Sequence, residues 1–342
     1  MRILFLSHRF YPDIGGIEVN AEILASAFQA AGHEVRLVTW SREKGNKRFP
    51  FEVTRSPGVW RLMRRHWWAD VVYENNPCLR LSWPALLFRK PDVIAIRAAL
   101  TGENTNAKLM AKVKLKWLER ARSVIAVSDA MRRTWWPAAK VIGNPYRADL
   151  FRNNNLTRDR EFVFVGRLVS DKGAELAIRA FSALLQQSVT NEHRRSCNLT
   201  IAGDGPEMHA LTSLARALGV SDNVSFVGVL KGEGLALCLN QHRYLLVPSL
   251  CEEGFGNVVL EGLACGCIPI ASDGGGLPEA VGKAGLLFPK GDVAALTECM
   301  RLVTEDKELV SSLVNARSAH LREHYPEVVA RKYLDVITTA VL

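Results

Sequence analysis

The sequence predicts an α/β protein built from two doubly wound domains, each a parallel sheet covered by helices on both faces. The chain has 342 residues, which is more than one hydrophobic core usually holds. Short apolar runs typical of buried strands alternate with amphipathic helical segments, and this alternation lapses near residue 150 and then restarts. With 48% hydrophobic and 23% charged residues, the composition is that of an ordinary globular protein.

The first half opens with a strand at 2–7, a loop ending in Gly15-Gly16, and an amphipathic helix that stops at Gly32. Further elements are strands at 33–40, 70–73, 92–96 and 123–128 and a basic helix at 108–122. The segment 144–160 has no periodicity and holds three consecutive asparagines, so it is the predicted linker. We therefore expect a first domain at 1–154.

The second half repeats the alternation and is expected to form a domain at 155–325. Its strands are predicted at 161–167, 197–202, 224–228, 244–248, 267–271 and 285–288, with helices at 172–185 and 206–219 among them. Ligands of such sheets bind at the carboxyl ends of the strands, so the loops that follow the strands are where functional residues are expected.

Charge and tryptophan are unevenly distributed between the halves. Residues 1–157 carry 26 Lys/Arg and 13 Asp/Glu, whereas residues 158–342 carry 18 and 22, and all eight tryptophans lie between Trp40 and Trp136. The two halves therefore meet different partners. A nucleic-acid-binding protein is the alternative of a different class, but no recognition motif is visible and no nucleic-acid partner is expected.

Several other classes fit poorly. No apolar run approaches the ~20 residues that span a bilayer, and the opening apolar run is a strand rather than a signal peptide. Seven cysteines without ligand spacing indicate reduced thiols in a cytosolic protein. A nicotinamide dehydrogenase needs a G-x-G-x-x-G turn after its first strand, which this chain lacks. A phosphorylase of similar architecture needs a cofactor lysine and a much longer chain.

Three loops at strand ends carry groups suited to an anionic ligand. Gly15 and Gly16 precede a helix whose backbone N–H groups can face an anion, although a tight turn alone would also use them. Arg167 and Lys172 flank the loop after the first strand of the second half and suit a diphosphate, unless they are solvated surface charges.

The third loop holds two carboxylates eight positions apart, Glu253 and Glu261. The backbone amides of a predicted helix start lie beside Glu253, and a carboxylate next to such amides suggests a sugar phosphate. The residues of this turn and helix start are Gly254, Phe255, Gly256, Asn257 and Val258.

Together these segments resemble the retaining GT-B glycosyltransferases of family 4. The resemblance rests on "FYPDIGGIEVNAEILASAFQAAGHEVRLVT", "VGRLVSDKGAELAIRAF", "IAGDGPE" and "PSLCEEGFGNVVLEGLACGCIPIASDGGGLPEAV", the last of which holds the family's E-x7-E pattern. It implies the GT-B fold, in which two Rossmann-like domains face a cleft. The first would bind the acceptor and the second the nucleotide sugar, and a C-terminal helix at 326–342 would pack back toward the first domain.

The resemblance also implies roles for the candidate residues. Glu253 would lie beside the donor sugar and Glu261 would bind the ribose hydroxyls. Arg167 and Lys172 would neutralise the diphosphate, which Gly15-Gly16 would approach from the other domain. Leu230 would lie near the nucleobase. No D-x-D is present, so no metal and no cofactor is expected. The favoured donor is UDP-glucose or another UDP-hexose, and a GDP-mannose-dependent mannosyltransferase is the alternative.

Arg97 departs from the family pattern, because many relatives carry a histidine near the end of that strand. A guanidinium cannot act as a base at working pH, so Arg97 is expected to contact phosphate or acceptor; the alternative is that it makes only a structural polar contact. We name no protein general base, since the leaving phosphate can accept the acceptor's proton in a transfer on one face of the sugar.

The stretch 60–68 reads "WRLMRRHWW" and joins three arginines to three tryptophans. Basic residues attract anionic headgroups and tryptophan favours the membrane interface, so we expect a peripheral protein on the cytoplasmic membrane face. Its acceptor would be a lipid-linked saccharide for a cell-surface polysaccharide. The alternative is that these tryptophans fill the core or stack on acceptor sugars.

Overall fold

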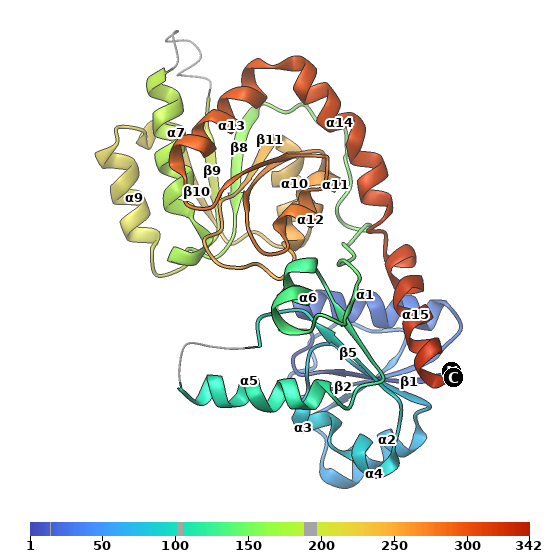
Figure 1. Ribbon diagram of the computed structural model, residues 1–342. Helices are drawn as coiled ribbons and strands as arrows, with labels where there is room; N and C mark the ends of the chain where they lie inside the picture. Colours follow the sequence, from blue (N-terminus) through green and yellow to red (C-terminus); the bar gives the residue numbers. More distant parts are fainter. Residues whose placement is uncertain (14, 101–104, 188–196) are drawn as a thin grey trace. The chain divides into compact units, whose positions relative to one another are not determined.

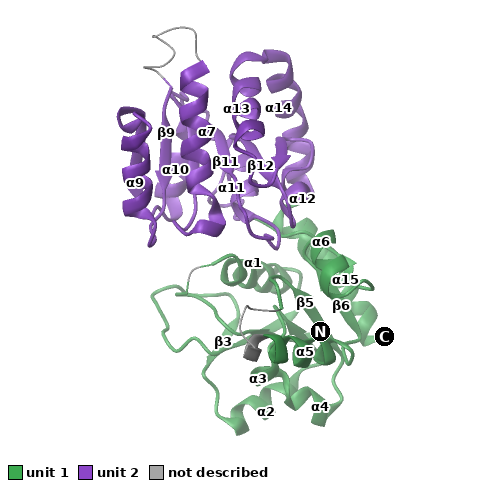
Figure 2. Ribbon diagram, turned by 60° about the vertical axis from the view of Figure 1, so that its left-hand side comes forward, with its two compact units in different colours: residues 1–146, 324–342 green, residues 147–323 purple. Residues whose placement is uncertain are grey.

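The computed structural model describes residues 1–13, 15–100, 105–187 and 197–342 (Figure 1). Its contacts divide the chain into unit 1, residues 1–146 and 324–342, and unit 2, residues 147–323 (Figure 2). The sequence placed the boundary eight residues later, at 154. Backbone groups of Arg152 and Asn154 bond to the Asn240 side chain, and Arg158 donates to Leu239 O, so this segment is held on unit 2.

Unit 1 is built on a parallel sheet in the order β3-β2-β1-β4-β5-β6-β7. The order reverses between β1 and β4, and ligands of doubly wound sheets bind at such switch points. The short edge strands β3 and β7 were not predicted, because neither carries a buried apolar run. The strands are β1 Arg2–Ser7, β2 Glu34–Thr39, β3 Glu52–Arg55, β4 Val71–Glu74, β5 Asp92–Ile96, β6 Ser123–Ala126 and β7 Lys140–Val141.

The helices of unit 1 include the last one of the chain, α15, which packs against α1, β4, β5 and β6. Its apolar residues recur every three or four positions from Val329 to Ala340, so one stripe is buried in the core of unit 1. The expected return of the C-terminal helix is therefore observed. The helices are α1 Gly16–Ala30, α2 Val59–Trp68, α3 Leu79–Ser82, α4 Pro84–Phe88, α5 Thr105–Leu118, α6 Asp129–Trp135 and α15 Pro326–Val341.

Unit 2 has a second parallel sheet in the order β10-β9-β8-β11-β12-β13, with its switch point between β8 and β11. Each of the six strands predicted for this half is present, within a few residues of the expected bounds. The strands are β8 Arg160–Val165, β9 Leu199–Ala202, β10 Val224–Gly228, β11 His242–Val247, β12 Ile268–Asp273 and β13 Leu286–Pro289.

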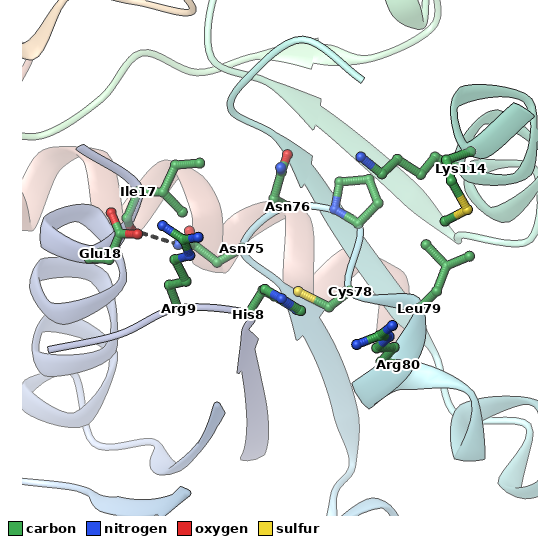
Figure 3. Close-up of a pocket in the computed structure, with 12 residues that line it drawn as sticks. His8, Arg9, Ile17, Glu18, Asn75, Asn76, Cys78, Leu79, Arg80 and Lys114 are labelled. Atoms are coloured by element: carbon green, nitrogen blue, oxygen red, sulfur yellow. Dashed lines mark hydrogen bonds between the residues drawn. The ribbon is translucent and has the colours of Figure 1, made fainter. Parts of the chain in front are cut away.

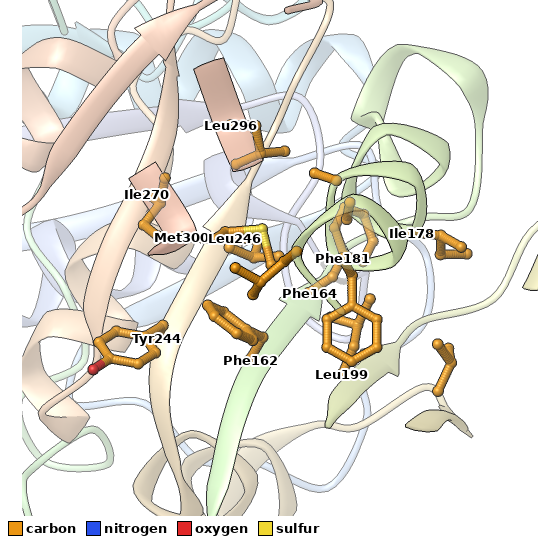
Figure 4. Close-up of a cluster of buried hydrophobic side chains, with 14 of the residues drawn as sticks. Phe162, Phe164, Ile178, Phe181, Leu199, Tyr244, Leu246, Ile270, Leu296 and Met300 are labelled. Carbon is orange, nitrogen blue, oxygen red and sulfur yellow. The ribbon is translucent and has the colours of Figure 1, made fainter. Parts of the chain in front are cut away.

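Both faces of the unit 2 sheet are covered. On one face Phe162, Phe164 and Leu246 pack with Phe181 of α7 and Met300 of α13 (Figure 4). On the other face α11 lies close, since a Cβ at Gly262 would be 2.5 Å from Leu245 Cδ2. The helices are α7 Ala174–Gln187, α9 Met208–Ala217, α10 Gly232–Gln241, α11 Asn257–Cys265, α12 Leu277–Val281, α13 Val293–Glu305 and α14 Lys307–Arg322, with 3-10 turns η1 Ser170–Lys172 and η2 Ser221–Asn223.

Candidate active site

The loops that follow β8, β11 and β12 meet at the switch point of unit 2. The amides of Leu250 and Cys251 donate to Asp171 O at 2.8 and 3.2 Å, which joins the β8 and β11 loops. The Gly276 amide donates to Glu253 O at 2.8 Å, which joins the β11 and β12 loops. Three segments far apart in sequence therefore form one backbone framework around Glu253.

Glycines make this framework possible. Gly173 has φ +72°, and a Cβ there would lie 1.9 Å from Pro248 O. A Cβ at Gly276 would lie 2.4 Å from Gly254 O. Neither position tolerates a side chain without moving backbone. The sequence shows these glycines but not their contacts, so their role in holding the loops together was not predicted.

Two predicted site residues form a direct ion pair. Lys172 Nζ lies 2.5 Å from Glu253 Oε1, and the same oxygen accepts from Ser249 Oγ at 3.0 Å. Partial burial is the largest single effect and lowers the pKa of Lys172, but the charge and the hydrogen bond of Glu253, with smaller contributions from Cys251 and Asp171, together outweigh burial, so the pKa is raised overall. The lysine is therefore charged. The sequence assigned Lys172 to a diphosphate and Glu253 to a sugar without predicting that they touch.

Glu261 lies one turn inside α11, which begins after Gly256 in a left-handed conformation (φ +96°). Burial raises the pKa of Glu261 to about 7, against an opposing effect of the Arg147 charge. Among the described residues its carboxylate has no hydrogen-bonding partner. A desolvated carboxyl group without such a partner is suited to bind ligand hydroxyls.

The other site residues predicted next to Glu253 form the turn after it and the start of α11. Gly254, Gly256, Asn257 and Val258 are partly exposed at the turn and helix start, whereas the Phe255 side chain is buried and can offer a ligand only its backbone.

Two other candidates lie in loops of unit 2. Arg167 is exposed after β8, and its side chain has no partner among the described residues. Leu230 is half-buried in the loop after β10, the edge strand of the sheet. Because β9 lies between β10 and β8, Leu230 follows a strand that does not border the switch point.

In unit 1 a cavity of about 320 Å³ opens at the switch point (Figure 3). Residues after β1 and β4, from α1 and α3, and from α5 line it, including His8, Glu18, Asn75, Arg80 and Lys114. Gly15 caps α1 in an extended conformation and Gly16 is its first residue. This cavity was not predicted from the sequence, although the polar residues directly after two apolar strands were a visible signal.

The family model of the glycosyl transferases group 1 matches residues 147–319. The chain belongs to this family. The matched region lies within unit 2 and includes the framework around Glu253.

Known proteins agree on the same class of enzyme. The chain is 36% identical to the glycogen synthase of Mycobacterium tuberculosis, over 90% of this chain and 86% of that one. It is 27% identical to the D-inositol 3-phosphate glycosyltransferase of Kribbella flavida, over 84% and 73%. The solved structure of Anabaena HepE in complex with UDP and glucose has a TM-score of 0.79 at 20% identity, covering 99% and 100%. The protein is a glycosyltransferase with the GT-B fold that the sequence predicted.

The structure corrects the expected role of Arg97 in this glycosyltransferase. Its side chain is 5% exposed, and its donors are used inside unit 1. Nε donates to Asn75 Oδ1, Nη1 to Asn144 Oδ1 at 2.7 Å, and Nη2 to the hydroxyls of Tyr73 and Tyr333 at 3.0 and 3.2 Å. Arg97 thus connects β4, β5 and α15. Because the guanidinium is buried and donates to these protein groups, it is not placed to contact phosphate or acceptor directly.

Proposed function

We propose that the protein is a retaining glycosyltransferase of family 4 that moves a hexose from a nucleotide sugar to a saccharide. UDP-glucose or another UDP-hexose is the favoured donor. The observation that carries the proposal is that the unit that matches the family holds the Lys172–Glu253 pair at its switch point and the Glu261 carboxylate on the helix that follows Glu253. The solved structure of HepE with UDP and glucose supports this choice of donor.

Each candidate group has a chemical task in this proposal. Lys172 and Arg167 stabilise the charge that develops on the departing nucleoside diphosphate, together with the amides at the start of α11. Glu253 positions Lys172 and the donor sugar, Glu261 binds the ribose hydroxyls, and Leu230 lies toward the base. The acceptor's proton passes to the leaving phosphate on the face where the new bond forms, so configuration is retained.

A donor screen tests the proposal. UDP-, GDP- and ADP-sugars are incubated with the enzyme and the released nucleotide is measured, with and without chelator. We expect release from a UDP-hexose, no dependence on divalent metal, and an α-linked first product by proton NMR. Preferential release of GDP would favour the alternative donor, GDP-mannose. A β product, or loss of activity with chelator, would contradict the mechanism.

Calorimetry tests the ribose role separately. Glu261→Ala is expected to weaken UDP binding about tenfold while the fold is kept, because about 1.4 kcal/mol of hydrogen bonding to the ribose is lost. The exposed Glu233 on α10 provides the matched control, Glu233→Ala. Equal UDP affinity in wild type and Glu261→Ala would contradict the role.

We further propose that the enzyme works as a peripheral protein on the cytoplasmic membrane face, on a lipid-linked saccharide for a cell-surface polysaccharide. Helices α2 and α4 pack together and expose Trp60 (82%), Trp67 (67%) and Leu87 (61%). Arg61 and Arg64 lie on the same α2 helix, so apolar and basic groups are combined on one surface.

The third tryptophan of the stretch 60–68 has a different role. Trp68 packs against a core cluster of unit 1, and the Arg36 guanidinium lies 3.9 Å from its ring centroid. Arg65 pairs with Glu52. Of the stretch 60–68, only Trp60, Arg61, Arg64 and Trp67 are therefore left to contact a membrane, fewer residues than the sequence predicted. No described helix is long and apolar enough to cross a bilayer.

Sedimentation with liposomes tests this surface. We expect binding to anionic vesicles that weakens at high salt and is lost in a Trp60→Ser/Trp67→Ser variant. Leu237→Ser, which removes an exposed apolar side chain from unit 2, should bind like wild type. Absence of wild-type binding to both anionic and neutral vesicles would contradict the membrane proposal.

A further inference from the structure

The cavity of unit 1 gathers positive charge. Arg9 follows β1, Arg80 belongs to α3 and Lys114 to α5, and the side chains of all three line the cavity (Figure 3). None of the three has a side-chain hydrogen bond or ion pair with another described residue. Glu18 of α1 is the acidic lining residue. Three cations facing one carboxylate leave a net positive site that an anion would neutralise.

The walls of this cavity are held in place by a buried carboxylate. Glu74 is fully buried at the end of β4, and its Oε2 accepts from the Cys78 amide at 2.6 Å. Its Oε1 accepts from Trp117 Nε1 and Arg120 Nη2, both at 2.9 Å, on the segment that carries Lys114. One side chain therefore fixes both the loop that leads to Arg80 and the helix of Lys114.

A second contact fixes the wall formed by α1. Asn75 Nδ2 donates to Ile17 O at 2.9 Å, which joins the end of β4 to the first turn of α1 (Figure 3). The cations are thus mounted on a framework of buried hydrogen bonds, and a ligand would find their supporting backbone already arranged.

We propose that this cavity binds a phosphate group of the acceptor, so that the saccharide accepted by the enzyme is phosphorylated. Arg80 and Lys114 are the main phosphate contacts and Arg9 adds charge at the rim. Guanidinium and ammonium groups form short charge-assisted hydrogen bonds with phosphate oxygens. The inference rests on the proposed glycosyltransferase function and adds the chemical class of the acceptor. The phosphate belongs either to a free sugar phosphate or to a lipid-linked sugar diphosphate.

His8 gives the site a pH dependence. Partial desolvation, followed by the charges of Arg80, Arg9 and Lys114, lowers the pKa of the His8 imidazole. The other titratable groups around it are Glu18 from α1 and the buried Cys78 thiol. A bound anion offsets the repulsion from the cations, so binding raises the pKa of His8 and favours uptake of a proton by the imidazole.

Calorimetry on the full chain tests the proposal with glucose 6-phosphate, glucose, and UDP as separate titrants. We expect wild type to bind glucose 6-phosphate more tightly than glucose. An Arg80→Gln/Lys114→Gln variant should lose at least tenfold in affinity for glucose 6-phosphate and keep its affinity for UDP. Lys140→Gln, which removes a cation from the β7 edge of the same unit, should match wild type for both.

Vesicles distinguish the two sources of phosphate. Phosphatidylcholine vesicles with and without an isoprenyl diphosphate sugar are sedimented with wild type and the double variant. Binding that needs both the diphosphate and the two cations assigns the site to a lipid-linked acceptor, and calorimetric binding of glucose 6-phosphate alone assigns it to a soluble one.

Two results would overturn the inference. One is equal affinity of wild type and the double variant for both phosphate probes. The other is a loss of UDP affinity in the double variant, because the cavity would then hold the donor's diphosphate. Absence of UDP binding by wild type would instead contradict the proposed function, so the two failures are distinguishable.

Discussion

In unit 2 one cation of the candidate site, Lys172, is already paired with Glu253 at 2.5 Å, whereas in unit 1 Arg9, Arg80 and Lys114 line a cavity without such partners among the described residues. A ligand at Lys172 must share the lysine with the Glu253 carboxylate or displace that carboxylate, so binding there depends on how closely the ligand's charge can approach Lys172. A ligand in the unit 1 cavity gains the attraction of the cations directly. The first arrangement suits a step in which charge develops, and the second suits recognition of a charge already present.

The largest expected effect breaks the pair in unit 2. Lys172→Met should lower donor turnover about 10²–10³-fold, because one preorganised positive group is lost where charge develops on the diphosphate. Turnover is measured at saturating donor, with circular dichroism to verify folding.

A neighbouring ion pair provides the control for Lys172. Lys290 pairs with Glu252, the residue before Glu253, and Glu252 is exposed. Lys290→Met should change turnover less than threefold. Equal turnover of Lys172→Met and wild type would mean that Lys172 does not stabilise developing charge, and the proposed difference between the two units would be wrong.

The next effect concerns Arg97, a cation of unit 1 that, unlike those of the cavity, donates its hydrogen bonds to buried groups of the same unit. Arg97→Met should lower the free energy of unfolding of unit 1 by about 3 kcal/mol, since four buried acceptors lose the hydrogen bond that Arg97 donates. All eight tryptophans lie in unit 1, so tryptophan fluorescence during denaturation reports this unit alone.

The exposed Arg122 offers the comparison, and Arg122→Met should leave that transition in place. If Arg97→Met kept wild-type stability but lost phosphate binding, the role first expected for Arg97 would be restored.

A smaller effect tests the glycine framework of unit 2. Gly173→Ala should destabilise unit 2 by about 2 kcal/mol or more, because the left-handed backbone costs about 1 kcal/mol and the new Cβ meets Pro248 O. Gly219 has nearly the same φ, +71°, with nothing within 4 Å, so Gly219→Ala should cost only the backbone term. Far-UV circular dichroism follows the transition, and identical midpoints for the two variants would show that the close approach is dispensable.

The last effect is a pH dependence at Glu261, whose side chain is partly exposed, so that solvent screening reduces its contribution to stability. Its pKa of about 7 in the folded protein lies above its ordinary value of 4.5, so between these values the folded chain holds a proton that the unfolded chain has released. Stability of unit 2 should therefore fall as pH rises from about 5 to 7. Glu261→Gln should flatten this slope, and Glu233→Gln should not. A slope unchanged by Glu261→Gln would mean that the carboxyl group is not desolvated.

Much of the fold could be predicted because parallel strands buried on both faces read as apolar runs. This applies to the six strands of unit 2, and it fails for β3 and β7, which lie at the sheet edge. The start of α15 at Pro326 was also visible, since proline suits a first helical turn and a regular apolar stripe follows it.

The site was predictable only as far as local geometry reaches. The spacing of Glu253 and Glu261 along one turn and helix is a property of the chain itself, so their placement before and inside α11 followed from the sequence. Their different surroundings did not. Glu253 meets Lys172, 81 residues away, and Glu261 remains without a hydrogen-bonding partner among the described residues.

The sequence by itself determined the alternation of strands and helices, the turns that end each strand and the family motifs, because periodicity and turn chemistry act over a few residues. The tertiary structure alone decided which charges are satisfied. Arg97 is bound by groups 22 to 236 residues away, and the cations of the unit 1 cavity come from three separate segments. Those meetings follow from the order of strands in the sheet, which places distant strand ends side by side and is not encoded in any local pattern.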